Sequence, residues 1–179
     1  MEKTLKKNVI YTGRIINVRR DDVLTADGVP CVREVVEHPG ATGIIAITDE
    51  GKILCVRQYR YPCGEYILEI PAGKLERGEE PLRCAKRELE EETGFTAARW
   101  DSLGSVYLSP GICDEKMHVF LARGLTPGEK CPDEDEVLEN EYYTAEELTQ
   151  MALRGELNDA KTFTALYMAR VFMEREMEE

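Results

Sequence analysis

The 179-residue sequence is poor in the residues that build zinc sites and disulfide frameworks. It contains only two histidines, His38 and His118, and its six cysteines include no Cys-x-x-Cys pair. Zinc sites need clustered thiolates and imidazoles, and disulfide frameworks are typical of small secreted domains. The cysteines stand apart from one another, some of them inside apolar runs such as "ILCV" at residues 53–56. We therefore expect free thiols in a reducing, cytoplasmic compartment.

Long apolar runs and basic stripes are also missing. No run approaches the ~18 residues of a membrane span, and the first residues lack the apolar core of a secretory signal. With a net charge of −12, the surface should repel nucleic acid. We expect neither nucleic acid nor membrane as a partner, and an anionic small molecule would need metal ions or converging arginines to bind.

Enough apolar residues are present, at 42%, for the packed core of one ordinary domain. Alternating apolar residues predict one hairpin around Asp27-Gly28 and a second one joined at residues 49–51. Further strands are expected at residues 65–70, 100–109, 116–123 and 137–143. Helical spacing predicts helices over residues 80–93, 145–155 and 159–176. We expect Leu82, Ala85 and Leu89 to face the core in the first helix. The last helix repeats the following residues on one broad face: Phe163, Leu166, Tyr167, Ala169 and Arg170.

The densest feature of the sequence is a group of seven glutamates between residues 71 and 95, namely Glu76, Glu79, Glu80, Glu88, Glu90, Glu91 and Glu92. Three of them, Glu88, Glu91 and Glu92, are spaced i, i+3 and i+4, so a helix puts them on one side. Carboxylates that close repel one another, unless they form a solvated acidic face or hold a cation. Hard divalent cations prefer carboxylate oxygen, so a magnesium or manganese site is the functional alternative.

The complete spacing, G-x5-E-x7-R-E-L-x-E-E-x-G-F, runs from Gly73 to Phe95 and resembles the Nudix box of the Nudix hydrolases at every defined position. The resemblance implies an α/β fold, an α/β/α sandwich around a mixed sheet, with an N-terminal β-hairpin subdomain. It implies a hydrolase that cleaves a nucleoside diphosphate linked to another moiety. Mg²⁺ is the implied cofactor, with Mn²⁺ as a substitute.

Carried over position by position, the resemblance assigns roles to the box. Glu88 and Glu92 become metal ligands, with Glu91 a third candidate and the carbonyl of Ala72 completing the set. Arg87 would anchor the carboxylates and Glu79 would brace the loop. Gly73 and Gly94 are structural positions of the box.

Segments outside the box, including "LEIPAGKLE" and "LSPG", resemble the ADP-ribose pyrophosphatase branch. By that match, the substrate contacts are Arg33, Arg60, Glu69, Ser109, Pro110 and Gly111. Arginine suits phosphate because its planar fork can grip two oxygens. An ordinary Ser-Pro-Gly turn and surface ion pairs are the alternatives.

An acidic loop, "PDEDEVLE" at residues 132–139, resembles the loop that carries a catalytic glutamate in this branch. Glu134 is then the candidate general base and Glu136 a further metal ligand, with Glu139 and Glu141 as alternatives for the base. A base must come within hydrogen-bond reach of the attacking water.

The expected reaction is Mg²⁺-dependent hydrolysis of ADP-ribose to AMP and ribose 5-phosphate. The resemblance also implies a homodimer, in which residues 1–38 serve dimerisation and the adenine side, while residues 39–179 form the hydrolase domain. The alternatives are a broader nucleoside diphosphate sugar pyrophosphatase (GDP-mannose included), a non-catalytic ADP-ribose sensor and a hydrolase of oxidised nucleoside triphosphates. The number of metal ions and the attacked phosphorus stay open.

Overall fold

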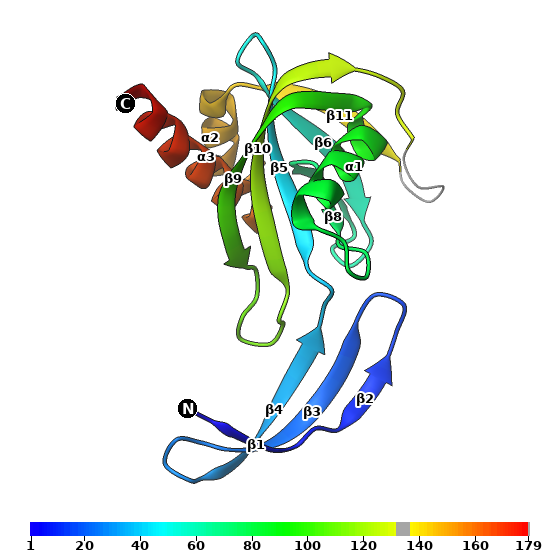
Figure 1. Ribbon diagram of the computed structural model, residues 1–179, viewed down its shortest axis with the longest axis vertical. Coiled ribbons are helices and arrows are strands. Elements are labelled where there is room, and N and C mark those ends of the chain that lie inside the picture. Colours follow the sequence, from blue (N-terminus) through cyan, green and yellow to red (C-terminus); the bar gives the residue numbers. More distant parts are fainter. Residues whose placement is uncertain (132–136, 179) are drawn as a thin grey trace. The chain divides into compact units, whose positions relative to one another are not determined.

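The computed structural model describes residues 1–131 and 137–178, and Figure 1 shows the course of the chain. The chain divides into two compact units. The first unit comprises residues 1–40 and 106–117, and the second unit comprises residues 41–105 and 118–179. Each unit is described below by itself.

The first unit is built around one long strand, β3 (Asn17–Leu24). β4 (Pro30–Glu37) pairs antiparallel along the whole of β3, through the hairpin predicted at Asp27-Gly28. Gly28 has a φ of +79°, a conformation that L side chains rarely adopt, which explains the glycine of this turn. β2 (Val9–Thr12) pairs with the first half of β3 and β1 (Lys3–Lys6) with its second half.

The second unit contains a larger sheet in the order β11-β6-β5-β10-β9, with β7 paired to β6 and β8 paired to β5. The bounds of these strands are β5 Ala41–Ile47, β6 Ile53–Arg60, β7 Glu65–Glu69, β8 Ala72–Lys74, β9 Phe95–Tyr107, β10 Lys116–Pro127 and β11 Leu138–Tyr143. β6 runs antiparallel to β5, β7 and β11, whereas β10 runs in the direction of β5, so the sheet is mixed (Figure 1).

In its described residues, the second unit also contains three helices: α1 (Pro81–Thr93), α2 (Ala145–Leu153) and α3 (Ala160–Glu178). β5 is buried over nearly its whole length because α1 and α3 both pack on it. Successive side chains of a strand point to opposite faces. Ile44 and Ala46 of β5 contact Ala85 and Leu89 of α1, so α3 covers the other face, and the helices sandwich the sheet (Figure 1). The α/β/α sandwich predicted from the sequence is thus confirmed.

The predicted helix faces are correct only in part. Leu82 of α1 is 39% exposed, contrary to the prediction, although Ala85 and Leu89 are fully buried as expected. On the broad face predicted for α3, Phe163 and Tyr167 are exposed, whereas Ala169 is buried. The buried residues of α3 are Thr162, Ala165 and Ala169, whose small side chains allow the helix to lie close to the sheet. A capping box between Thr144 and Glu147 begins α2.

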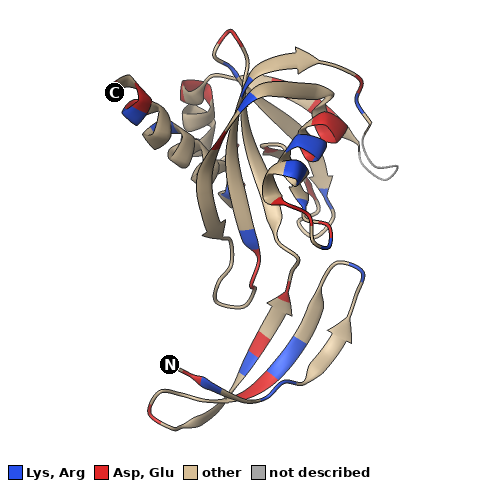
Figure 2. Ribbon diagram, in the orientation of Figure 1, with Lys and Arg blue, Asp and Glu red and all other residues tan. Residues whose placement is uncertain are grey.

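Charge is spread unevenly over the second unit. Along α1, basic residues precede a run of acidic ones at the C-terminal end, as Figure 2 shows.

Across the part of the chain that the structure describes, no helix combines the length and the apolar character needed to cross a membrane.

Candidate active site

The acidic helix α1 is delimited by local signals at both ends. Pro81 stands at its first turn, where a missing N–H costs nothing, and Glu80 before it is extended. At the other end Gly94 has a φ of +76°, and its N–H donates to the carbonyl of Glu90 at 2.8 Å. Glu88, Glu91 and Glu92 therefore fall in the last turns, and the last turn contains no basic residue.

That placement is electrostatically unfavourable for the helix alone. The C-terminal end of a helix carries the negative end of its dipole, and it favours cations over carboxylates. Acidic side chains concentrated at this end need positive charge from elsewhere. The structure supplies part of it through one arginine of the same helix.

Arg87 donates to three carboxylates. Its Nη1 lies 2.8 Å from Glu88 Oε1 and 2.8 Å from Glu91 Oε2. Its Nε and Nη2 each lie 3.1 Å from an oxygen of Glu79, and Nη2 also reaches the carbonyl of Lys74 at 3.3 Å. One guanidinium thus ties α1 to the loop that precedes it, which is the anchoring position that the sequence predicted for Arg87.

The pKa of Glu79 is strongly lowered by Arg87. The hydrogen bond from Arg87 lowers the pKa of Glu79 to about 2, against the opposing effect of burial. Its Oε2 also accepts the N–H of Glu76 at 3.0 Å, which fixes the turn before the helix. Glu79 therefore stays ionised at neutral pH and braces this loop.

Glu88 and Glu92 both lie against the short strand β8. The N–H of Ala72 donates to Glu92 Oε2 at 3.0 Å, and Glu92 is buried. Glu88 lies over Gly73 so closely that a Cβ built at Gly73 would meet its carboxyl carbon at 1.8 Å. Any side chain at this position would have to displace the carboxylate of Glu88. Two carboxylates from one turn of α1 thus converge on two neighbouring residues of β8.

These oxygen donors are of the kind that a hard divalent cation prefers. Glu88, Glu92 and the main chain of Ala72 lie together, and Glu91 is held near them through Arg87. No group of three or more His, Cys, Asp or Glu side chains arranged to hold a metal is found over residues 1–131 and 137–178. The chemistry of the donors fits such an ion. Glu136, the further ligand predicted from the sequence, lies outside the described residues, as does Glu134.

The segments flanking residues 132–136 are attached to the C-terminal end of α1. The N–H of Cys131 donates to the carbonyl of Glu91 at 3.2 Å, and Asn140 Nδ2 donates to the carbonyl of Thr93 at 2.8 Å. Lys130 Nζ joins the two flanks by donating to the carbonyl of Leu138 at 2.6 Å. Cys131 and Asn140, which are described residues on either side of this segment, are therefore bonded to the last turn of α1.

The two alternatives for the loop base, Glu139 and Glu141, are both on β11. Glu141 is bound by the guanidinium of Arg57 and by the hydroxyl of Tyr143, and the hydrogen bond from Arg57 lowers its pKa. A carboxylate held in this way is a weak base. These contacts argue against Glu141 as the group that takes a proton from water.

Arg60 and Glu69, predicted as substrate contacts, are brought together. Arg60 Nε and Nη2 donate to the two oxygens of Glu69 at 2.7 and 2.6 Å. Glu69 is buried, and Lys161 Nζ binds the same carboxylate from α3. Lys161 was not predicted from the sequence. A lysine in the first turn of a helix has no motif to mark it, and 92 residues separate it from Glu69.

The other predicted substrate residues belong to the first unit. Arg33 is exposed and donates to the carboxylate of Glu2. Ser109, Pro110 and Gly111 form the expected turn, in which the carbonyl of Ser109 accepts the N–H groups of Ile112 at 3.1 Å and Cys113 at 2.9 Å. Their contact with substrate stays a prediction.

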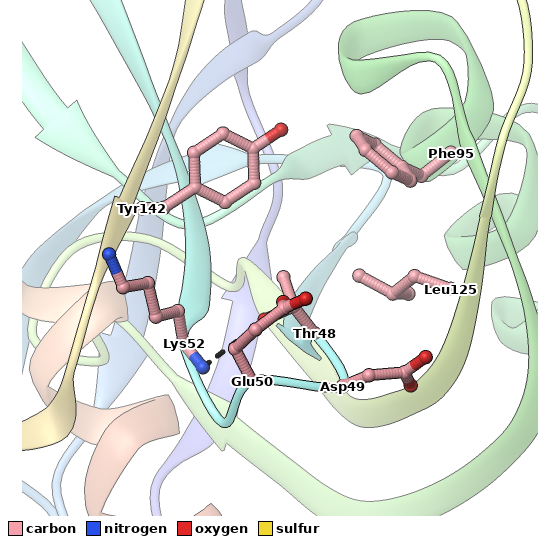
Figure 3. Close-up of a pocket in the computed structure, with 7 residues that line it drawn as sticks. All are labelled: Thr48, Asp49, Glu50, Lys52, Phe95, Leu125 and Tyr142. Atoms are coloured by element: carbon pink, nitrogen blue, oxygen red, sulfur yellow. Dashed lines mark hydrogen bonds between the residues drawn. The ribbon is translucent and has the colours of Figure 1, made fainter.

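A separate hollow of about 410 Å³ lies at the turn between β5 and β6. In Figure 3, Tyr142 faces Phe95 and Leu125 across it. The polar lining residues are Thr48, Asp49, Glu50 and Lys52, so that two carboxylates oppose one lysine. This charge balance does not suit a diphosphate, and the cationic groups suited to one lie instead near Glu69.

Comparisons with known proteins agree with this geometry. A model of the NUDIX domain matches residues 37–166, and a model of the nucleoside diphosphate sugar hydrolase N-terminal domain matches residues 2–36. The chain is 47% identical over 167 residues to the ADP-ribose pyrophosphatase of Bacillus subtilis (strain 168), covering 92% of this chain and 90% of that protein. It is 44% identical to the methanol dehydrogenase activator of Bacillus methanolicus, with the same coverage.

Among solved structures, the crystal structure of an ADP compounds hydrolase superposes with a TM-score of 0.86 at 25% identity, covering 98% of this chain and 95% of that one. The fold, the intact box and the sequence relatives point to the same family. Because the domain model spans well over half of the chain and relatives match along nearly its whole length, the chain belongs to the NUDIX family.

Proposed function

We propose that this protein is a Mg²⁺-dependent hydrolase that cleaves ADP-ribose to AMP and ribose 5-phosphate. The observation that carries the proposal is the convergence of Glu88 and Glu92 on Ala72 and Gly73, with Arg87 tying Glu88, Glu91 and Glu79 together. A relative at 47% identity is named ADP-ribose pyrophosphatase, which supports the choice of substrate.

The metal is held, in this proposal, by Glu88, Glu92 and the carbonyl of Ala72, with Glu91 and Glu136 as further ligands. A divalent ion bound there supplies charge neutralisation of the diphosphate and activation of water for attack on phosphorus. Arg87 keeps the carboxylates in place, since it bonds Glu88 and Glu91 through one nitrogen. Mn²⁺ should substitute for Mg²⁺ because both accept oxygen ligands.

The protein's own groups divide the remaining work. Glu134 takes the proton from the attacking water as the general base. Arg60 binds a phosphate oxygen, because its Nη1 is not used in the bonds to Glu69. Arg33 and residues 109–111 are the further substrate contacts of this proposal, and residues 1–38 form the adenine side.

A substrate panel tests this function. ADP-ribose, GDP-mannose, other nucleoside diphosphate sugars and an oxidised nucleoside triphosphate are incubated with Mg²⁺ or Mn²⁺, and products are separated by chromatography. We expect AMP and ribose 5-phosphate from ADP-ribose at the highest kcat/KM. Faster turnover of GDP-mannose, or equal rates across the sugars, would replace the ADP-ribose assignment with a broader one.

Glu92→Gln is the variant that tests catalysis. It removes a charge from the proposed ligand set and should lower kcat by about 100-fold or more, on the scale of losing a transition-state electrostatic contact. Glu90→Gln is the matched control, since Glu90 is an exposed acid of the same helix. If wild-type protein bound ADP-ribose without releasing AMP, the sensor alternative would stand in its place.

A second candidate function comes from the relative named methanol dehydrogenase activator, at 44% identity over 92% of this chain. We propose as a second possibility that this protein also raises the rate of a methanol dehydrogenase. The test adds wild-type protein or Glu92→Gln to that enzyme and follows methanol oxidation. We call Glu88, Glu91 and Glu92, together with Ala72 and Gly73, the carboxylate site. Activation by wild type alone would mean that the effect depends on this site. If neither protein activates the dehydrogenase, the second candidate function is rejected.

We also propose a homodimer and a cytoplasmic location. The first unit leaves several large apolar side chains more than half exposed, including Val9, Ile10 and Tyr11. A partner copy would cover such side chains. None of the six cysteines, all of them described, is in a disulfide, which agrees with a reducing compartment.

A further inference from the structure

The buried carboxylate of Glu69 lies between two cations that come from different elements. Glu69 ends β7 and is 2% exposed. Arg60, at the end of β6, binds both of its oxygens, and Lys161 of α3 binds Oε2. Burial on its own raises the pKa of the Glu69 carboxyl, but the hydrogen bond from Arg60 and the charges of Lys161 and Arg60 outweigh it and lower the pKa. Together, the two cations favour the ionised form of this buried carboxylate.

Lys161 stands where a helix does not favour lysine. It is the second residue of α3, and the positive end of the helix dipole disfavours a cation in the first turn. Its side chain is only 12% exposed, so it also loses hydration. Both costs call for compensation, and the bonds to Glu69 and to Asp159 at 3.0 Å provide it.

The start of α3 is fixed firmly enough to hold this lysine in one place. Asp159 precedes the helix and accepts the N–H of Thr162 at 3.0 Å, as an N-cap residue does. The hydroxyl of Thr162, a fully buried residue, in turn accepts the N–H of Ile70 at 3.0 Å. This joins α3 to the residue that follows Glu69, so Lys161 and Glu69 are held in register.

Arg60 differs from Lys161 in its exposure. Its side chain is 39% exposed, and the bonds to Glu69 use Nε and Nη2 but not Nη1. The hydrogen bond to Glu69 is the main cause that raises the pKa of Arg60, and the charge of Glu92, a proposed metal ligand, adds to it. The guanidinium is thus fixed by Glu69 on one side, while Nη1 takes no part in those bonds.

We infer that Lys161 is a positioning residue: by holding Glu69, it fixes the guanidinium of Arg60 so that Nη1 can bind a phosphate of a nucleoside diphosphate. This inference rests on the proposed function, because it takes Arg60 as a substrate contact. Lys161 itself does not touch the substrate. Without it, one anchor of the Glu69 carboxylate is lost, and Arg60 samples other orientations.

The test measures binding of a methylene-bridged ADP-ribose analogue by calorimetry, so that no turnover is needed. We expect Lys161→Met to raise Kd about tenfold, because the variant loses one charge-assisted hydrogen bond that holds Glu69 and, through it, orients Arg60. Lys161→Arg should restore Kd to within about threefold of wild type, since it keeps the charge. Lys52→Met, an exposed lysine at the turn between β5 and β6, is the matched control and should leave Kd unchanged.

A double variant separates positioning from general damage. If Lys161 acts through Arg60, then Lys161→Met should add nothing to the Kd of Arg60→Met. With ADP-ribose as substrate, Lys161→Met should raise KM while kcat stays within about twofold, the pattern of lost ground-state binding. The midpoint of thermal unfolding, measured for every variant, confirms that each one is folded.

The inference is overturned if Lys161→Met leaves Kd unchanged, or if it weakens binding equally in the Arg60→Met background. A fall in thermal stability without a change in Kd would assign Lys161 to folding alone. If wild-type protein binds the analogue but does not hydrolyse ADP-ribose, the proposed hydrolysis fails while the role of Lys161 stands. If wild-type protein does not bind the analogue, both fail.

Discussion

At the scale of single residues, Gly73 offers the sharpest test of the carboxylate site. A methyl group at this position would overlap the carboxylate of Glu88, so Gly73→Ala must push Glu88 away from β8. Displacing a catalytic group by about 1 Å can cost about 100-fold in rate. We therefore expect kcat for ADP-ribose to fall by about 100-fold.

Gly155→Ala is the control for this substitution. Its methyl group would meet nothing within 4 Å, but its φ of +74° is unfavourable for alanine. It should lower the free energy of unfolding by about 1 kcal/mol and leave kcat unaltered. Full activity in Gly73→Ala would show that Glu88 does not need its observed position.

The ion pair between Glu79 and Arg87 makes stability depend on pH. The pKa of Glu79 is lowered from 4.5 to about 2, so the pair contributes stability above pH 4.5 and loses it as the pH falls through 2. EDTA is added to remove metal ions. At pH 6 the free energy of unfolding of Glu79→Gln should then be about 1–2 kcal/mol lower than that of wild type, after allowance for solvent screening. Urea unfolding should show this difference shrinking towards pH 2.

Arg87→Met provides the check on that prediction. Without the guanidinium, the pKa of Glu79 has lost its main cause of lowering, so the effect of Glu79→Gln should no longer vary with pH over this range. A pH-dependent difference that persists in Arg87→Met would assign the shift to another group.

Helical spacing predicted that Glu88, Glu91 and Glu92 share one side of α1, and the bonds from Arg87 to Glu88 and Glu91 span only one and four positions. The positions of Glu79, Ala72 and Gly73 in the site were implied by the resemblance to the Nudix box and not by periodicity. The bond between Lys161 and Glu69 spans 92 positions and depends on how α3 docks on the sheet. No periodicity in one sequence reports that distance.

At the scale of elements, the sequence predicted the three helices and the longer strands but not the shortest ones. β1, β2 and β8 have three or four residues each, too few for a periodic signal. The face of α3 was predicted only in part. Ala169 of the predicted face is buried, but so are Thr162 and Ala165, which hydrophobic patterns rank below the exposed Phe163 and Tyr167.

The close contact of α3 with the sheet predicts opposite outcomes for two substitutions. Ala165 is fully buried, so Ala165→Leu forces extra volume into a packed layer and should cost about 1–3 kcal/mol of unfolding free energy. Tyr167 is 69% exposed, so Tyr167→Leu should change it by no more than about 0.5 kcal/mol. Urea denaturation measures both. Equal losses would mean that the observed face of α3 is not the buried one.

At the scale of the whole molecule, the first unit presents an imbalance between apolar surface and core. Within residues 1–40, Val23 is the one buried hydrophobic side chain. On β2, Val9 pairs with Arg19 and Tyr11 with Val18, which are adjacent residues of β3 and point to opposite faces, and Val9, Ile10 and Tyr11 are all more than half exposed. A sheet of this size with apolar residues exposed on both faces of a strand is poorly stabilised alone. A second copy of the chain is the partner that the proposed dimer supplies.

Light scattering after size exclusion then gives a direct outcome. Wild type should have twice the chain mass of 20.3 kDa. Ile10→Asp places a charge on the proposed interface, where a buried unpaired charge is strongly disfavoured, so it should shift the protein to the mass of one chain. Leu153→Asp is the matched control, because Leu153 at the end of α2 is also more than half exposed but lies in the second unit, and it should stay dimeric. The interface would lie elsewhere if the dimer survives Ile10→Asp or dissociates with Leu153→Asp. The reason is that a new charge weakens association only where the partner chain buries it.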